Sequence, residues 1–178
     1  MQMTHYMELL ASNQPWNLIL FMAIPVILAE TVAITELVIL FTGKRTGNIA
    51  TLSKFAGITG GIYFIGVFFY LLFTAVIPLT TTGTWRGIAD VVAVGFYLLG
   101  IIPLVGIALV DMGIIGGPTG ERKSLKLHAT FVGIFLVFAH IAMIFGMLDP
   151  SILGWQQPMQ NSPMNMNDTM PGMDHRNM

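Results

Sequence analysis

The sequence has no cysteine among its 178 residues, and only 10% of its residues are charged. Without cysteine the chain forms no disulfide, thiolate nucleophile, cysteine-ligated zinc site or iron–sulfur cluster. The charged fraction is far below the ~25% typical of a soluble domain. Eight lysines and arginines face nine aspartates and glutamates, so no basic surplus exists for binding nucleic acid. These scarcities exclude an ordinary soluble domain and argue against a nucleic-acid partner.

Apolar sequence, in contrast, is abundant, with a mean hydropathy of +0.75. A membrane-spanning helix needs roughly 20 predominantly apolar residues. Four stretches meet this requirement, at residues 16–41, 55–79, 87–115 and 127–148. We therefore predict an all-α integral membrane protein, built as an antiparallel four-helix transmembrane bundle in the lipid bilayer.

The chain divides into three parts around these spans. Residues 1–14 have the pattern of a short amphipathic helix on the outer surface, and residues 15–149 hold the transmembrane domain. Residues 150–178 are polar and rich in methionine, a composition that predicts a flexible tail.

The basic residues predict the orientation of the chain in the cell membrane. Six of the eight lie in or beside the first and third links between spans, and such residues favour the cytoplasmic side. Both termini are therefore expected on the outer, non-cytoplasmic side. Trp16, Trp85 and Trp155 agree, because each falls at the outer end of a span and tryptophan favours the headgroup level.

Two prolines, Pro25 and Pro103, lie inside the first and third spans. Proline removes a backbone N–H and clashes with the carbonyl four residues earlier, so each should kink its helix and free a carbonyl. Inside a bilayer a freed carbonyl needs a partner, which a buried polar side chain can supply.

Five ionisable residues lie within the spans, where their cost marks them as functional candidates. The rise of 1.5 Å per helical residue places Glu36, Asp111 and His128 together near the inner ends of their spans, as an inner polar cluster. Glu36 and Asp111 could equally serve as anchors that pair with basic residues of the loops. Glu30 and His140 lie nearer the midplane, either as one hydrogen-bonded pair, as a proton relay or as two metal ligands.

Methionine suggests a soft metal. His140, Met143 and Met147 form one stripe on the fourth span, and thioether with imidazole suits Cu(I) far better than magnesium or calcium. His5 and Glu8 are one helical turn apart on the outer segment and could add ligands. Packing explains methionines in helices, but the tail has nothing to pack against. The candidate capture residues of the tail are Met164, Met166, Met170, Met173 and His175.

Three function classes follow. The first is a membrane protein that binds or transfers copper, or holds it as a redox site, with iron or zinc as variants in a four-helix bundle. The second is a b-type haem protein that exchanges electrons with quinol, although His128 and His140 lie too far apart on one helix to clamp one haem. The third is a cofactor-free proton- or cation-coupled carrier, or an accessory subunit of a membrane complex. Four short-looped spans favour an oligomer or other membrane subunits as partners.

The sequence contains no Walker loop, dinucleotide fingerprint, zincin motif or nucleophile elbow. Any enzymatic activity would therefore belong to a bound metal or haem, as in a membrane oxidoreductase.

Overall fold

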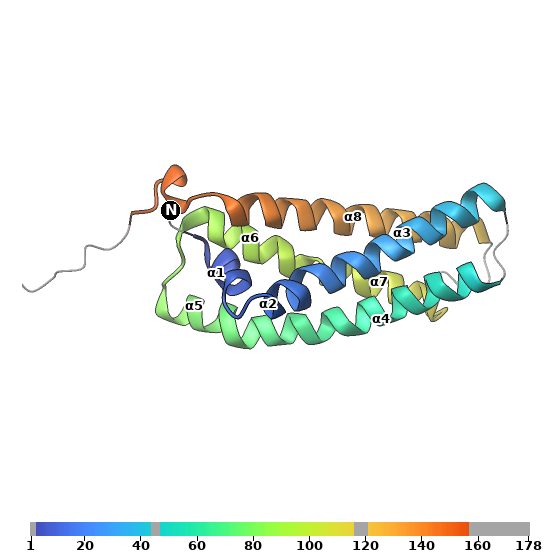
Figure 1. Cartoon of the computed structure of the whole chain (residues 1–178), viewed down its shortest axis with the longest axis horizontal. Coiled ribbons are helices and arrows are strands. Elements are labelled where there is room, and N and C mark those ends of the chain that lie inside the picture. Colours follow the sequence, from blue (N-terminus) through green and yellow to red (C-terminus); the bar gives the residue numbers. More distant parts are fainter. Residues whose placement is uncertain (1–2, 44–46, 116–120, 157–178) are drawn as a thin grey trace, which may run out of the picture.

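The computed structural model describes residues 3–43, 47–115 and 121–156. Within these ranges the chain is helical, without a strand, and four helical stretches are long and apolar enough to cross a membrane. The stretches are Trp16–Thr42, Asn48–Thr82, Gly87–Asp111 and Leu125–Met147. They lie side by side along the long axis of the molecule (Figure 1).

Each stretch is assembled from shorter elements. The first consists of α2 (Trp16–Leu18), a π-helical turn (Ile19–Ala23) and α3 (Ile24–Thr42), and the second of α4 (Asn48–Leu71), a π-helical turn (Leu72–Val76) and α5 (Ile77–Thr82). The third joins α6 (Gly87–Leu99) to α7 (Ile101–Asp111), and the fourth lies within α8 (Glu121–Met147). The short helix α1 (His5–Ala11) precedes them, and a 3-10 turn (Pro150–Leu153) follows.

Two of these helices begin ahead of the apolar spans expected from the sequence. α4 starts at Asn48 rather than near residue 55, and α8 starts at Glu121 rather than near residue 127. Lys54 and Lys126 therefore lie on helices, where both are exposed. The third stretch ends at Asp111, before the expected residue 115, because Gly113 takes a positive φ of 75°.

Pro25 acts as the sequence predicts. Pro25 follows the π-helical turn, and the carbonyl of Phe21, four residues earlier, accepts a hydrogen bond from the hydroxyl of Tyr97 on α6. The neighbouring carbonyl of Leu20 accepts one from the hydroxyl of Tyr63 on α4, at 2.8 Å. Tyrosines of two other spans therefore satisfy the backbone that is opened before Pro25.

The core is an apolar cluster along the centre of the helices. Phe64 of α4 is its largest fully buried side chain and contacts Tyr97 and Phe135, with ring centroids 5.4 and 6.2 Å apart. Large apolar side chains such as Phe41, Phe55 and Phe73 are exposed on the outside of the bundle, as expected for helices that face lipid.

α1 belongs to this core as well. Its residues Tyr6 and Leu10 are buried in the cluster, so α1 packs into one end of the helices. The link between α5 and α6 and the turn after α8 lie at the same end (Figure 1).

Candidate functional site

The structure brings the three residues of the inner polar cluster together. His128 of α8 lies between Glu36 of α3 and Asp111, the last residue of α7. Its Nδ1 is 3.0 Å from Glu36 Oε1, and its Nε2 is 3.1 Å from Asp111 Oδ1. The hydroxyl of Ser53 on α4 donates to Glu36 Oε1 at 3.1 Å. All four membrane-spanning stretches therefore contribute a side chain to this cluster.

The side chains of the cluster are almost completely buried. The side chain of His128 is 1% exposed, and those of Glu36 and Asp111 are each 8% exposed. A glycine makes this possible, since a Cβ at Gly57 of α4 would collide with Asp111 Oδ2. The close approach of α4 to α7 thus places a carboxylate against bare backbone, where a larger residue would expel it.

The carboxylate oxygens lie within ion-pair distance of the His128 ring nitrogens, but away from the directions of the ring N–H bonds. The contacts are therefore ion pairs without linear hydrogen bonds. A neutral imidazole carries one N–H and one lone pair. Its lone pair and a carboxylate oxygen repel each other at such a distance in a medium of low dielectric constant. The cluster is therefore stable when it holds one further proton, on the ring or on a carboxylate.

The cluster adjoins a pocket of about 240 Å³ near the link between α3 and α4. Its polar lining comes from Glu36, Ser53, Lys54 and Asp111. Lys54 is exposed and lines the same pocket as the two carboxylates. The pocket gives the buried cluster a short route to one end of the molecule.

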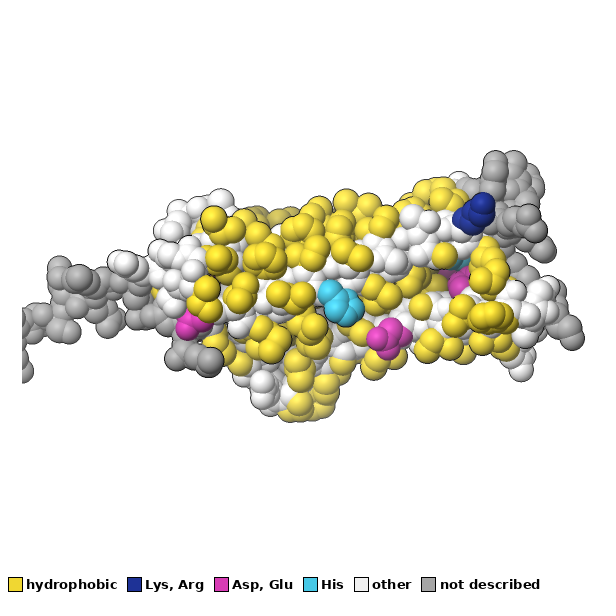
Figure 2. All heavy atoms as spheres, turned by 90° about the horizontal axis from the view of Figure 1, so that it is seen from above, with side chains coloured by type: hydrophobic (Ala, Val, Ile, Leu, Met, Phe, Trp, Pro, Cys, Tyr) yellow, Lys and Arg dark blue, Asp and Glu magenta, His cyan; other side chains and the backbone are white. Residues whose placement is uncertain are grey.

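The two midplane residues line a second pocket, of about 160 Å³, between α3 and α8. Met143 and Met22 share this lining with Glu30 and His140, and the other walls are apolar or aromatic. In the described part of the chain no ion pair joins Glu30 to His140, and Nδ1 of His140 contacts the carbonyl of Leu136 at 2.6 Å. Figure 2 shows a hydrophobic face that is interrupted, near the middle of its length, by a histidine and an acidic side chain.

Met147, the last residue of the predicted stripe, does not line this pocket and is 69% exposed. The pocket instead ends against Tyr6 of α1. Burial raises the pKa of the Tyr6 phenol to about 12. The phenol is therefore uncharged at physiological pH and adds no charge to the lining of the pocket.

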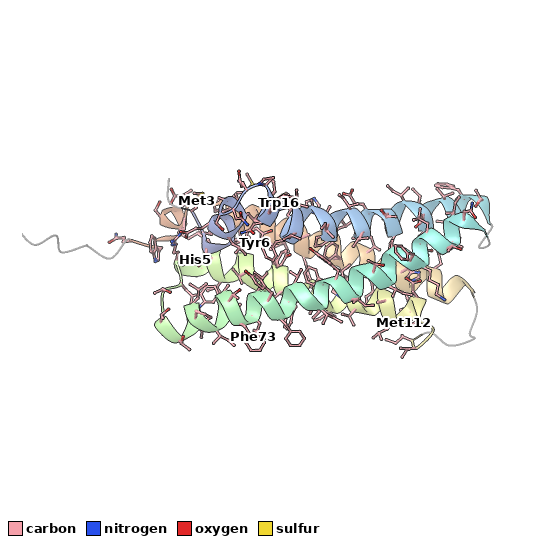
Figure 3. The ribbon with its side chains drawn as sticks, turned by 60° about the horizontal axis from the view of Figure 1, so that its bottom comes forward. Met3, His5, Tyr6, Trp16, Phe73 and Met112 are labelled. Carbon is pink, nitrogen blue, oxygen red and sulfur yellow. The ribbon has the colours of Figure 1, made fainter. Side chains whose placement is uncertain are left out.

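The predicted outer ligands His5 and Glu8 have other partners. His5 Nδ1 lies 2.6 Å from Asp90 Oδ2, and the His5 backbone N–H donates to Asp90 Oδ1 at 2.8 Å. Glu8 pairs with Arg86 at 2.7 Å, and Arg86 also donates to the carbonyl of Met3 at 2.5 Å. Figure 3 shows Met3, His5 and Tyr6 close together, at the opposite end of the molecule from Met112.

The sequence does not predict a role for Ser53 in the cluster or for Asp90. Asp90 is completely buried in the first turn of α6 and lies inside the third apolar span, as Asp111 does. A carboxylate one turn after the start of a helix, with Arg86 just before it, is the available signal. The identity of its partner, His5, depends on how α1 folds back.

The remaining site residues predicted from the sequence are Met164, Met166, Met170, Met173 and His175. They lie outside the described residues.

Two features define the class to which this chain belongs: four helices able to span a membrane, and a buried cluster of ionisable residues near one end of them. More particularly, the chain belongs to a family of unknown function (DUF6803), whose family model matches residues 1–162. No curated protein and no solved structure matches the chain.

Proposed function

We propose that this protein binds and transfers protons in the membrane, through the cluster of Glu36, His128 and Asp111. It would act as a proton-coupled carrier or as the proton-binding subunit of a membrane complex. The observation that supports this proposal is the position of one buried histidine between two carboxylates, with each ring nitrogen about 3 Å from one of them.

The arrangement suits proton transfer because the two ring nitrogens lie close to different carboxylates. A histidine can accept a proton at one nitrogen and release another from the second nitrogen. At His128 this exchange would carry a proton between the Glu36 side and the Asp111 side. The pocket lined by Lys54 and both carboxylates provides the exchange with water at that end of the bundle.

This cluster suits a proton better than a metal or haem. The side chains do not converge on a common point, because the two carboxylates lie on different nitrogens of the ring. In the described ranges, no group of three or more histidine, aspartate and glutamate side chains has an arrangement that could hold a metal ion. A haem iron needs a free histidine nitrogen as its axial ligand, and each nitrogen of His128 has a carboxylate oxygen at 3.0 or 3.1 Å.

The finer topology is part of the proposal. The distribution of lysine and arginine supports an antiparallel bundle in the cell membrane, with both termini on the outer side. The inner polar cluster would then exchange protons with the cytoplasm. The small number of spans supports assembly with further copies or with other subunits.

The proposal is tested by the protonation state of His128 in the full-length protein in nanodiscs. Labelling with ¹⁵N-histidine distinguishes a doubly protonated ring from either neutral tautomer, and His128→Gln assigns the signal. At neutral pH we expect both His128 nitrogens to carry protons. Glu36→Gln and Asp111→Asn should each shift the ring toward a neutral tautomer, because each removes one negative charge.

Transport is measured in proteoliposomes that contain a pH-sensitive dye. After an acid jump, wild-type protein should dissipate the proton gradient faster than His128→Gln. His140→Gln is the matched control, because it makes the same change on the same helix away from the cluster, and it should behave like wild type. Equal rates for wild type and His128→Gln would contradict the proposal, and so would a His128 ring whose signals are the same in wild type, Glu36→Gln and Asp111→Asn.

A further inference from the structure

A second site, independent of the proton cluster, is indicated by the pocket between α3 and α8. Four side chains with metal-ligating atoms line it: Met22 from the π-helical turn, Glu30 from α3, and His140 and Met143 from α8. They supply two thioethers, an imidazole and a carboxylate. Sequence spacing predicts only the His140–Met143 pair, since Met22 reaches the pocket through the packing of a different span.

His140 has the tautomer that a metal ligand needs. Its Nδ1 lies 2.6 Å from the carbonyl oxygen of Leu136, one turn earlier on α8. A carbonyl only accepts hydrogen bonds, so Nδ1 must be the nitrogen that carries the hydrogen. The neutral ring then has its lone pair on Nε2. Histidine ligands of metals commonly have one nitrogen bound to a backbone carbonyl in this way, which fixes the other for the metal.

The ligand set and its surroundings select the class of ion. Thioether sulfur and imidazole favour soft ions such as Cu(I), whereas magnesium, calcium and manganese prefer oxygen ligands and water. The rest of the lining is apolar and aromatic, with Phe21, Phe96 and Phe135 among it. A monovalent cation in such a medium requires one negative charge nearby, and Glu30 is the carboxylate of the lining.

The two methionines of the pocket are half-buried and line a cavity of about 160 Å³. Met22 also packs against the apolar core, whereas Met143 is not among the described residues that do so. Met147 continues the same stripe on α8 but lies outside the pocket. The pocket therefore separates the two methionines of the stripe: Met143 shares the cavity with Met22, Glu30 and His140, and Met147 lies outside it.

We propose that this pocket is a binding site for a soft monovalent cation, Cu(I), with His140 Nε2 and the thioethers of Met22 and Met143 as ligands. Glu30 balances the charge of the ion. The site lies on different residues from the proton cluster, so either proposal can fail while the other holds.

The experiment is a titration of the full-length, metal-free protein in nanodiscs with Ag(I), a redox-inert probe for Cu(I). The readout is the ¹⁵N signal of the His140 ring, which reports this site even when other methionines also bind the ion. We expect Ag(I) to shift Nε2 of His140 and to leave the ring signals of His128 unchanged.

Competition with a Cu(I) chelator then measures affinity in the variants. Met22→Leu and Met143→Leu should each weaken the binding detected at His140 by about tenfold, which corresponds to about 1.4 kcal/mol. Met147→Leu is the matched control and should stay close to wild type. Failure of Ag(I) to shift His140, or equal effects of Met143→Leu and Met147→Leu, would overturn the proposal.

Discussion

At the scale of single residues, the membrane-embedded carboxylates of this protein have different environments. Asp90 is completely buried and accepts from three donors: the backbone N–H and ring of His5, and the backbone N–H of Arg86 at 3.2 Å. Glu30 is exposed at a pocket. Because an unpaired buried charge is costly, Asp90 is tied to its partners. It is a structural anchor for α1, whereas Glu30 remains available to a ligand.

We predict that Asp90→Asn loosens α1. Asparagine replaces one acceptor oxygen with an N–H₂ group that would face donors, at a cost of about 1–3 kcal/mol. The free energy for local opening of residues 5–11 should fall by this amount, measured by hydrogen exchange of the purified protein.

Glu8→Gln is the control for this prediction. Glu8 is 55% exposed in its pair with Arg86, so the change should cost no more than about 1 kcal/mol. Equal protection of α1 in Asp90→Asn and wild type would contradict the anchoring role of Asp90.

At the scale of the elements, close packing of α4 against α7 depends on small residues. A Cβ at Gly61 would lie 2.5 Å from the Cβ of Ala108 and 2.9 Å from the backbone oxygen of Leu104. Neither neighbour is a flexible side-chain end, so the helices would have to separate. Gly66, on the same helix, has nothing within 4 Å of the corresponding position.

Gly61→Ala should therefore lower the unfolding temperature in detergent, with a loss of about 1–3 kcal/mol from overpacking. Gly66→Ala is the matched control, and it should be neutral or stabilising by up to about 1 kcal/mol, because alanine favours the helix. If the two variants unfold at the same temperature, the contact between α4 and α7 is looser than described.

The sequence predicts some of these features and not others. Proline chemistry predicts that a carbonyl before Pro25 needs a partner, but it cannot identify Tyr97, which comes from another span. Helical rise likewise places Glu36, Asp111 and His128 at one depth, yet depth alone does not say which way each side chain faces. The contact between them depends on helix rotation and on the space left by Gly57, both of which are set by tertiary packing.

At the scale of the whole molecule, the two proposed sites lie at different levels along the helices. The proton cluster lies near the link between α3 and α4, and the pocket with Met22 and His140 extends toward α1. The compartment that supplies protons to the cluster therefore depends on which end of the bundle faces the cytoplasm.

That orientation is accessible to single-cysteine labelling, because the natural chain contains no cysteine and each variant has one thiol. Thr84 lies in the link between α5 and α6 and Ser151 in the turn after α8, both at the end of the bundle that holds α1 (Figure 1), whereas Asn48 begins α4, near the link between α3 and α4; all three residues are exposed. A membrane-impermeant maleimide should label Thr84→Cys and Ser151→Cys on intact cells, but Asn48→Cys only after permeabilisation, because lysine and arginine favour the cytoplasmic side. The reverse pattern would mean that the proton cluster opens to the outside, and it would reverse the direction of proton uptake while leaving the chemistry of His128 unchanged.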